Sequence, residues 1–154
     1  MSVVEALQAC SLFKEFTETG IRIFAAIAVE KGVEAGAPLF AEGMAGESLF
    51  IVRSGQVRVT VKEARGEREL AVLGPCEHLG ALGLLTRSTR LVSAVAVGTC
   101  EVVELTQRDF ARLQPQKPQA CLKLALAIAG ELAGRAGENR ELLHELISRK
   151  PAGD

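Results

Sequence analysis

The sequence predicts a mainly β domain, an antiparallel β-roll of the jelly-roll type with short N-terminal helices and one long C-terminal helix. Two observations predict the β-roll. Short strand-like runs fill residues 29–105, and glycines separate these runs at intervals of about ten residues. A third observation predicts the flanking helices, because before and after this region the apolar residues recur with a helical period. The length of 154 residues is that of one domain.

Residues 1–28 are predicted to form a helical flank in front of the roll. Ser2 and Ser11 each precede a short helical pattern and are expected to be N-caps, because a hydroxyl oxygen can accept from the free amides of a first turn. Thr17 is the expected N-cap of a third helix over residues 18–28.

The β-roll is predicted over residues 29–105, and its clearest strand is residues 56–63. Three valines are expected on one face of that strand and three more polar residues on the other, namely Val57, Val59 and Val61 against Arg58, Thr60 and Lys62. Residues 64–67 predict a hairpin turn into the next strand, residues 68–73.

Residues 106–148 are predicted to be helical, with Thr106 as the N-cap of a short helix and a bend at Pro115 and Pro118. One long helix is expected over residues 119–148. Its apolar seam consists of Leu122, Leu126, Ala129, Ala133, Ala136, Leu143 and Ile147. The helix can either pack on the roll alone or also meet a second copy, and its length favours the second interpretation.

The charge balance and the cysteine content limit which partners and which cellular compartment the chain is expected to have. The chain has 18 Lys and Arg against 19 Asp and Glu, which offers no electrostatic attraction for nucleic acid or an anionic membrane. No segment has the pattern of a signal peptide or a membrane span. The four cysteines lack any CxxC spacing, so we expect reduced thiols in a cytoplasmic protein: Cys10, Cys76, Cys100 and Cys121.

The sequence indicates no enzyme, because catalytic and metal sites in a small β-roll depend on clustered histidines. The two histidines, His78 and His144, are far apart in the chain. A metal centre of the cupin type needs several histidines and a carboxylate. A nucleophile such as Cys76 would need a histidine or another cation beside it, so we expect an ordinary small core residue there and a half-exposed loop histidine at His78. No catalytic residue and no metal ligand is predicted.

Residues 79–94 form the one candidate binding segment. Gly80 opens a short apolar helix, and Arg90 follows a brief polar loop. Helix N-termini present free N–H groups to anions, and an arginine on the same side of the pocket would reinforce such a site. The alternative is that Gly80 only makes a turn while Arg90 lies in solvent or pairs with an acid such as Glu77.

Seven segments of the chain follow one another in a known order. They are Leu12–Phe13, Ala35–Gly43, Leu49–Val59, Val72–Leu85, Thr89–Val95, Val102–Leu113 and the terminal helix. In this order they resemble the cyclic-nucleotide-binding domain of catabolite-activator-type regulators, protein kinase A regulatory subunits and cyclic-nucleotide-gated channels. The resemblance covers nearly the full length and implies a β-roll flanked by helices, all within one domain.

The resemblance implies that residues 79–94 are the phosphate-binding cassette of this family. In such a cassette the turn at Gly80 holds a cyclic phosphate with backbone amides, and Arg90 pairs with the same phosphate. The ligand-binding positions that the resemblance implies are Gly80, Ala81, Leu82, Arg90 and Leu91.

This chain departs from the family pattern at several cassette positions. Ala81 replaces the glutamate that accepts a hydrogen bond from the ribose 2′-hydroxyl, and Leu79 and Cys76 replace a phenylalanine and a glycine. Leu91 and Val92 stand where small residues normally lie against the phosphate. Loss of the ribose acceptor is expected to cost roughly 1–3 kcal/mol, or about 5- to 150-fold in affinity. The expected occupant is therefore weakly bound cAMP or cGMP, another small anion, or none, and no other cofactor is expected.

Together these features predict a non-enzymatic regulatory or sensor module. An alternative is a ligand-independent interaction module that docks a partner protein or forms a homodimer through residues 119–148. A third interpretation is a sensor fragment of a larger transcription regulator or channel. Transcription factors of the family carry a helix-turn-helix after the long helix, so 154 residues as a complete protein would not read DNA by that route.

Overall fold

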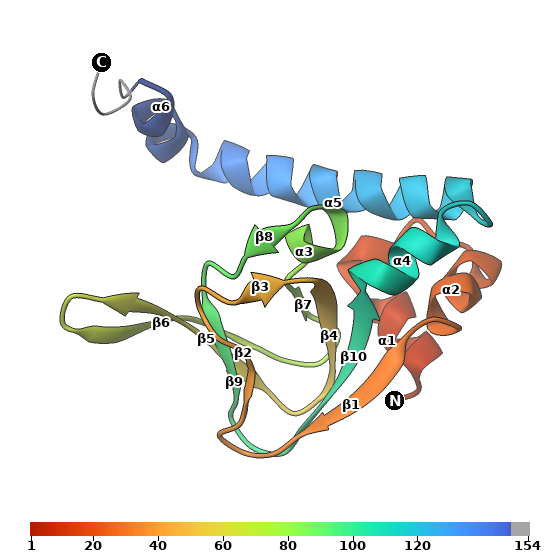
Figure 1. The fold of residues 1–154 in the computed structure, drawn as a ribbon, viewed down its shortest axis with the longest axis horizontal. Helices are drawn as coiled ribbons and strands as arrows, with labels where there is room; N and C mark the ends of the chain where they lie inside the picture. Colours follow the sequence, from red (N-terminus) through yellow and green to blue (C-terminus); the bar gives the residue numbers. More distant parts are fainter. Residues whose placement is uncertain (149–154) are drawn as a thin grey trace.

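A computed structural model describes residues 1–148 and confirms the predicted antiparallel β-roll (Figure 1). Within these residues the strands are β1 (Val29–Val33), β2 (Pro38–Phe40), β3 (Ala45–Gly46), β4 (Ser48–Ser54), β5 (Val57–Glu63), β6 (Gly66–Leu73), β7 (His78–Leu79), β8 (Ser88–Thr89), β9 (Ser93–Ala96) and β10 (Cys100–Thr106). They form two four-stranded sheets, in the orders β1-β10-β4-β7 and β2-β9-β5-β6, and the short pair β3-β8. All pairs are antiparallel.

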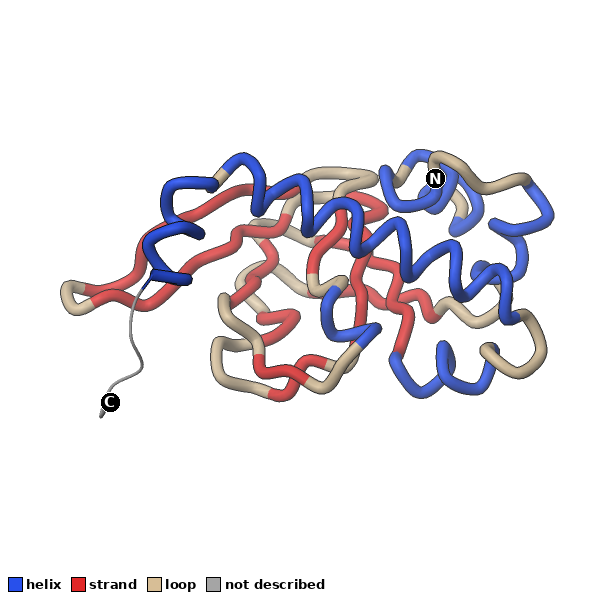
Figure 2. The backbone as a smooth tube through the Cα atoms, turned by 90° about the horizontal axis from the view of Figure 1, so that it is seen from above, coloured by secondary structure: helices blue, strands red, loops and turns tan. Residues whose placement is uncertain are grey.

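The hairpin of β5 and β6 forms where the sequence predicts it and projects from the roll (Figures 1 and 2). Glu63 pairs with Gly66, so the turn between the strands is two residues long. One detail of the predicted alternation is wrong, because Thr60 is buried at 4% exposure instead of facing outward with Arg58 and Lys62. The pairing register shifts between Val59 and Thr60, and such a bulge redirects the side chains that follow it.

The N-terminal flank contains α1 (Val3–Ala9), the 3₁₀ helix η1 (Ser11–Phe13) and α2 (Glu18–Ala25). Ser2 caps α1 as predicted, in a capping box with Glu5, and Thr17 caps α2 by accepting from the Gly20 amide at 3.2 Å. Ser11 was predicted to be an N-cap, but its side chain caps no helix and contacts the C-terminal helix instead.

One short helix, α3 (Leu82–Leu85), lies within the roll between β7 and β8. The roll is followed by α4 (Gln107–Leu113), α5 (Pro118–Glu138) and α6 (Arg140–Ser148). Thr106 caps α4 as predicted. The single helix expected over residues 119–148 is instead two helices, because the backbone leaves the helical conformation at Asn139. The Asn139 side chain donates to the Arg135 carbonyl at 2.9 Å and closes α5. The side chain of Leu143, part of the predicted seam, lies outside the described residues.

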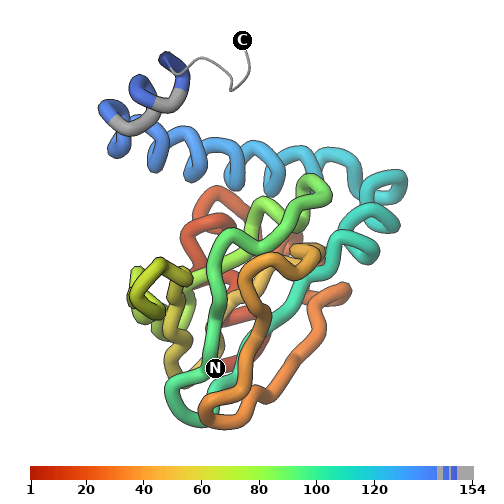
Figure 3. The backbone as a smooth tube through the Cα atoms, turned by 60° about the vertical axis from the view of Figure 1, so that its left-hand side comes forward, coloured from red at the N-terminus to blue at the C-terminus, as the bar shows by residue number. Residues whose placement is uncertain are grey.

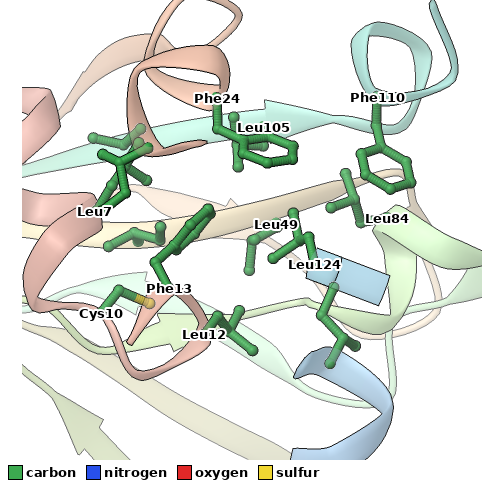
Figure 4. Close-up of a cluster of buried hydrophobic side chains, with 14 of the residues drawn as sticks. Leu7, Cys10, Leu12, Phe13, Phe24, Leu49, Leu84, Leu105, Phe110 and Leu124 are labelled. Carbon is green, nitrogen blue, oxygen red and sulfur yellow. The ribbon is translucent and has the colours of Figure 1, made fainter. Parts of the chain in front are cut away.

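Helix α5 runs along one side of the roll and passes over the segment that contains α3 and β8 (Figures 1 and 3). Three of its side chains are buried: Cys121, Leu124 and Ile128. They enter the apolar cluster that joins the helices to the roll, together with Phe13, Phe24, Leu49, Leu105 and Phe110 (Figure 4). A second apolar cluster fills the roll itself and includes Phe40, Phe50, Val52, Leu79 and Val102.

In residues 1–148 no helix combines the length and the apolar character that a membrane crossing requires.

Candidate functional site

The turn at Gly80 requires a residue without a side chain. Its φ is +79°, in the left-handed region that glycine adopts at little cost. A Cβ atom at this position would lie 2.4 Å from Nη1 of Arg90 and 2.7 Å from the Ser48 carbonyl oxygen. Both backbone conformation and space therefore explain the glycine, and they place Gly80 directly against Arg90.

Arg90 is folded into the roll and is only 8% exposed. Its Nη2 donates to the carbonyl of Ser48 at 2.8 Å, and its Nη1 donates to the carbonyl of Gly80 at 3.4 Å. The guanidinium carbon lies 4.2 Å from the centroid of the Phe40 ring. These contacts exclude the alternative in which Arg90 lies in solvent or pairs with Glu77, whose carboxylate accepts from the Gly74 amide.

The positive charge of Arg90 is incompletely satisfied within residues 1–148. No carboxylate of these residues forms an ion pair with it, and its buried Nε has no hydrogen-bond partner. Burial lowers the pKa of Arg90, and the charge of Glu104 opposes this effect. The guanidinium carries five N–H donors, so donors remain for an anion.

A cavity of about 230 Å³ lies at this turn. It is lined by Phe40, His78, Leu79, Gly80, Ala81, Leu82, Gly83, Ser88, Thr89, Arg90, Leu91, Val92, Leu132 and Arg135. All five positions proposed from the sequence are therefore brought together: Gly80, Ala81, Leu82, Arg90 and Leu91. Leu91 is 75% exposed, so much of its side chain faces solvent, and its predicted crowding of a phosphate stays a prediction.

The charged and polar groups of the lining are all of types that suit an anion. They are the side chains of His78, Arg90 and Arg135 and the hydroxyls of Ser88 and Thr89. Within residues 1–148, no carboxylate is among the residues that line the cavity, and Ala81 presents only a methyl group. The described lining therefore carries cationic and hydroxyl groups of the kind that bind anions, and it includes no carboxylate acceptor.

Two residues of this cavity come from α5 and could not be assigned to it from the sequence. Leu132 and Arg135 line it because α5 crosses the roll at this point. Helical periodicity identifies α5 but does not say which turn lies over which strand. A single sequence carries no other signal for this contact.

His78 and Cys76 also differ from the prediction. The side chain of His78 is only 10% exposed, since it lies under α5 and its Nε2 is 2.6 Å from a carboxylate oxygen of Glu131. Cys76 is half-buried and is not a core residue. It has a φ of +73°, the conformation expected of the glycine that the family resemblance implies at this position.

Comparison with known proteins agrees with this geometry. The family model of the cyclic nucleotide-binding domain matches residues 30–116. The cyclic AMP receptor protein of Thermus thermophilus is 39% identical over 98 residues, which are 63% of this chain and 45% of that protein. The chain thus spans less than half the length of this relative.

Two solved structures support the same assignment. The N-terminal domain of a transcriptional regulator from Streptomyces coelicolor has a TM-score of 0.78 at 27% identity, covering 84% of this chain and 94% of that one. The regulatory domain of Toxoplasma gondii PKA, co-crystallised with cAMP, has a TM-score of 0.66 at 30% identity, covering 72% of this chain and 42% of that one. With its roll, cassette turn and buried arginine, this chain belongs to the cyclic nucleotide-binding domain family.

Proposed function

We propose that this chain is a non-enzymatic regulatory module whose cavity holds a small phosphate-bearing anion at Gly80 and Arg90, with cyclic nucleotides bound only weakly. One observation carries the proposal: Arg90 is buried beside the cavity and forms an ion pair with no carboxylate of residues 1–148. Burying a charge without a counter-charge is costly, and an anionic ligand would remove much of that cost.

The turn offers backbone donors as well as the guanidinium. Within it, the amides of Gly83 and Leu84 donate to the carbonyls of Gly80 at 3.0 Å and Ala81 at 3.1 Å. The amides of Ala81 and Leu82 come first in the turn and are the donors that an anion would use. Each charge-assisted hydrogen bond from Arg90 would contribute about 1.5–3 kcal/mol.

The rest of the cavity favours a ligand with an apolar or aromatic part. Leu82, Val92 and Leu132 line it beside the charged groups. A nucleotide has this combination, and relatives named or co-crystallised with cAMP support the cyclic nucleotide class. Ala81 provides no acceptor for the ribose, so we expect an affinity about 5- to 150-fold below that of a site with the acceptor.

A titration tests the proposal. Calorimetry or ligand-observed NMR measures binding of cAMP, cGMP, a cyclic dinucleotide and inorganic phosphate to wild type, Arg90→Gln and Arg87→Gln. Arg87 is exposed and does not line this cavity, so Arg87→Gln is the control. Weak binding that is lost in Arg90→Gln and kept in Arg87→Gln is expected.

Two results would contradict the proposal. If the Arg90→Gln variant still bound these ligands, Arg90 would not form part of the anion site. Tight cAMP binding that depends on Arg90 would show that a cyclic nucleotide is recognised fully without the glutamate. Thermal unfolding of each variant checks the fold, and Arg90→Lys, which keeps the charge, serves if Arg90→Gln does not fold.

Self-association through α5 is a second candidate function. Four residues of its apolar seam face solvent: Leu122 is 59% and Leu126 is 62% exposed, and Ala129 and Ala133 are also exposed. These exposed side chains are separate from Cys121, Leu124 and Ile128, the buried side chains of α5 that hold it on the roll. An apolar stripe of this kind suits a second copy of the same helix.

A further inference from the structure

The second half of α5 has little that holds it on the roll. Ile128 is its last buried residue, and beyond it Leu132 is 37% exposed. The segment also contains Gly130, Gly134 and Gly137, each with open space where a Cβ would stand. Glycine weakens a helix, so intrinsic propensity does not fix this segment either. Yet Leu132 and Arg135 lie in the lining of the cavity.

One side chain ties this segment to the domain from two sides. Oε2 of Glu131 lies 2.6 Å from Nε2 of His78 on β7, and Oε1 accepts from the Ser11 hydroxyl at 2.5 Å. His78 is two residues before Gly80, and Glu131 directly precedes Leu132. The contact therefore joins η1, the approach to the cassette and α5 at the edge of the cavity.

The charges around this contact keep Glu131 ionised. Burial raises the pKa of Glu131, but its contacts with Ser11 and His78 and the charge of Arg135 outweigh burial, and the net shift is downward. Of the neighbouring groups, Glu77 accepts a hydrogen bond from the Gly74 amide, and Cys76 lines a second cavity together with His78 and Glu131. A carboxylate is thus available to accept from both partners.

We propose that Glu131 is a positioning residue of the cavity: held by Ser11 and His78, it keeps residues 129–138 of α5 over the cassette, with Leu132 and Arg135 in the lining. Removal of the carboxylate releases this segment while Cys121, Leu124 and Ile128 still anchor the first half of the helix. Ligand then meets a cavity that is open on the α5 side.

Amide hydrogen exchange tests the tether without any ligand. Glu131→Ala is compared with Glu138→Ala, an exposed glutamate of the same helix, and with wild type. We expect exchange over residues 131–138 to be about tenfold faster in Glu131→Ala and unchanged in Glu138→Ala. Alanine is the better helix former, so faster exchange cannot come from helix propensity. Equal exchange in all three proteins would overturn the proposal.

The imidazole of His78 provides a spectroscopic signature. The chain has two histidines, and His144 on α6 is exposed, so it is an internal control. We expect a slowly exchanging Nε2 proton for His78 in wild type, absent for His144 and lost in Glu131→Ala. His78→Gln, whose amide can still donate, should restore more protection than His78→Ala. Identical protection in these two variants would contradict donation from this position.

A measurement of ligand affinity tests whether the tether positions the cavity, and this test rests on the function proposed above. With cAMP as the probe, Glu131→Ala is expected to bind about 5- to 20-fold more weakly than Glu138→Ala. Faster exchange with unchanged affinity would show that the tether does not position the cavity, and would leave the proposed function intact. If wild type bound no probe, the proposed function would fail, and the exchange result would still decide the tether.

Discussion

Gly80 and Arg90 lie against each other, and the position of each depends on the other. The glycine leaves room for Nη1 of Arg90, and Arg90 in turn satisfies the carbonyls of Gly80 and Ser48. Glycine and arginine at this spacing were recognisable in the sequence. The burial of Arg90 was not, because it depends on Phe40 and Gly46, which come from other parts of the chain.

Gly80→Ala is expected to destabilise the domain more than Gly36→Ala. Both glycines have nearly the same φ, +79° and +78°, but a Cβ at Gly36 meets open space. The difference therefore isolates the clash with Arg90 and Ser48, for which we expect about 1–3 kcal/mol in the free energy of unfolding. Urea denaturation measures it. Equal losses in the two variants would mean that the close approach to Arg90 has no energetic weight.

Ala81→Glu is expected to raise affinity for cAMP. The new carboxylate would supply the missing acceptor for the 2′-hydroxyl and increase binding by about 5- to 150-fold. Ala81→Leu has similar bulk without an acceptor and should give no increase. A calorimetric titration of both variants checks this, and an equal response of the two would contradict the role assigned to position 81.

At the scale of elements, features that depend on neighbours in the sequence are predictable, and features that depend on distant residues are not. Ser2, Thr17 and Thr106 cap helices as predicted, because a cap depends only on the next three residues. Ser11, with the same chemistry, bonds to Glu131, which lies 120 residues further along the chain. The bulge at Thr60 likewise lies in a pairing between two strands that periodicity does not identify. The break at Asn139 is a local feature, closed by a hydrogen bond to Arg135, that the apolar periodicity of residues 119–148 does not reveal.

Ala129→Arg is expected to disrupt a dimer formed through α5. The exposed seam of Leu122, Leu126, Ala129 and Ala133 would have to bury the new charge. Size-exclusion chromatography with light scattering should show a dimer for wild type and a monomer for the variant. Ala111→Arg, at an exposed alanine of α4, is the matched control. A strictly monomeric wild type at high concentration would contradict self-association.

At the scale of the whole molecule, the order of strand-like runs and the glycine spacing predicted the roll, and the resemblance predicted its family. The placement of α5 over the cavity could not be predicted, because it depends on the packing of Cys121, Leu124 and Ile128 against residues throughout the chain. Burial in this shared core also changes the chemistry of the thiols.

Stability is expected to fall in alkali through Cys10. Burial raises the pKa of the Cys10 thiol from 9.0 to about 11. The thiol therefore favours the folded state fully below pH 9, and this contribution of roughly 2–3 kcal/mol is lost as the pH rises through about 11. Urea unfolding from pH 8 to 11 should show a shallower decline in Cys10→Ala. The chain has no tyrosine to add a phenolate titration. An identical decline in the variant would contradict this role.

The central claim is that the cavity holds an anion at Arg90 but makes no carboxylate contact to a ribose hydroxyl. The most direct test is the affinity of wild type for cAMP and for 2′-deoxy-cAMP, measured by titration under one set of conditions. We predict that the two affinities agree within about twofold and that both are lost in Arg90→Gln. Binding of cAMP about tenfold or more tighter than its 2′-deoxy analogue would contradict the claim.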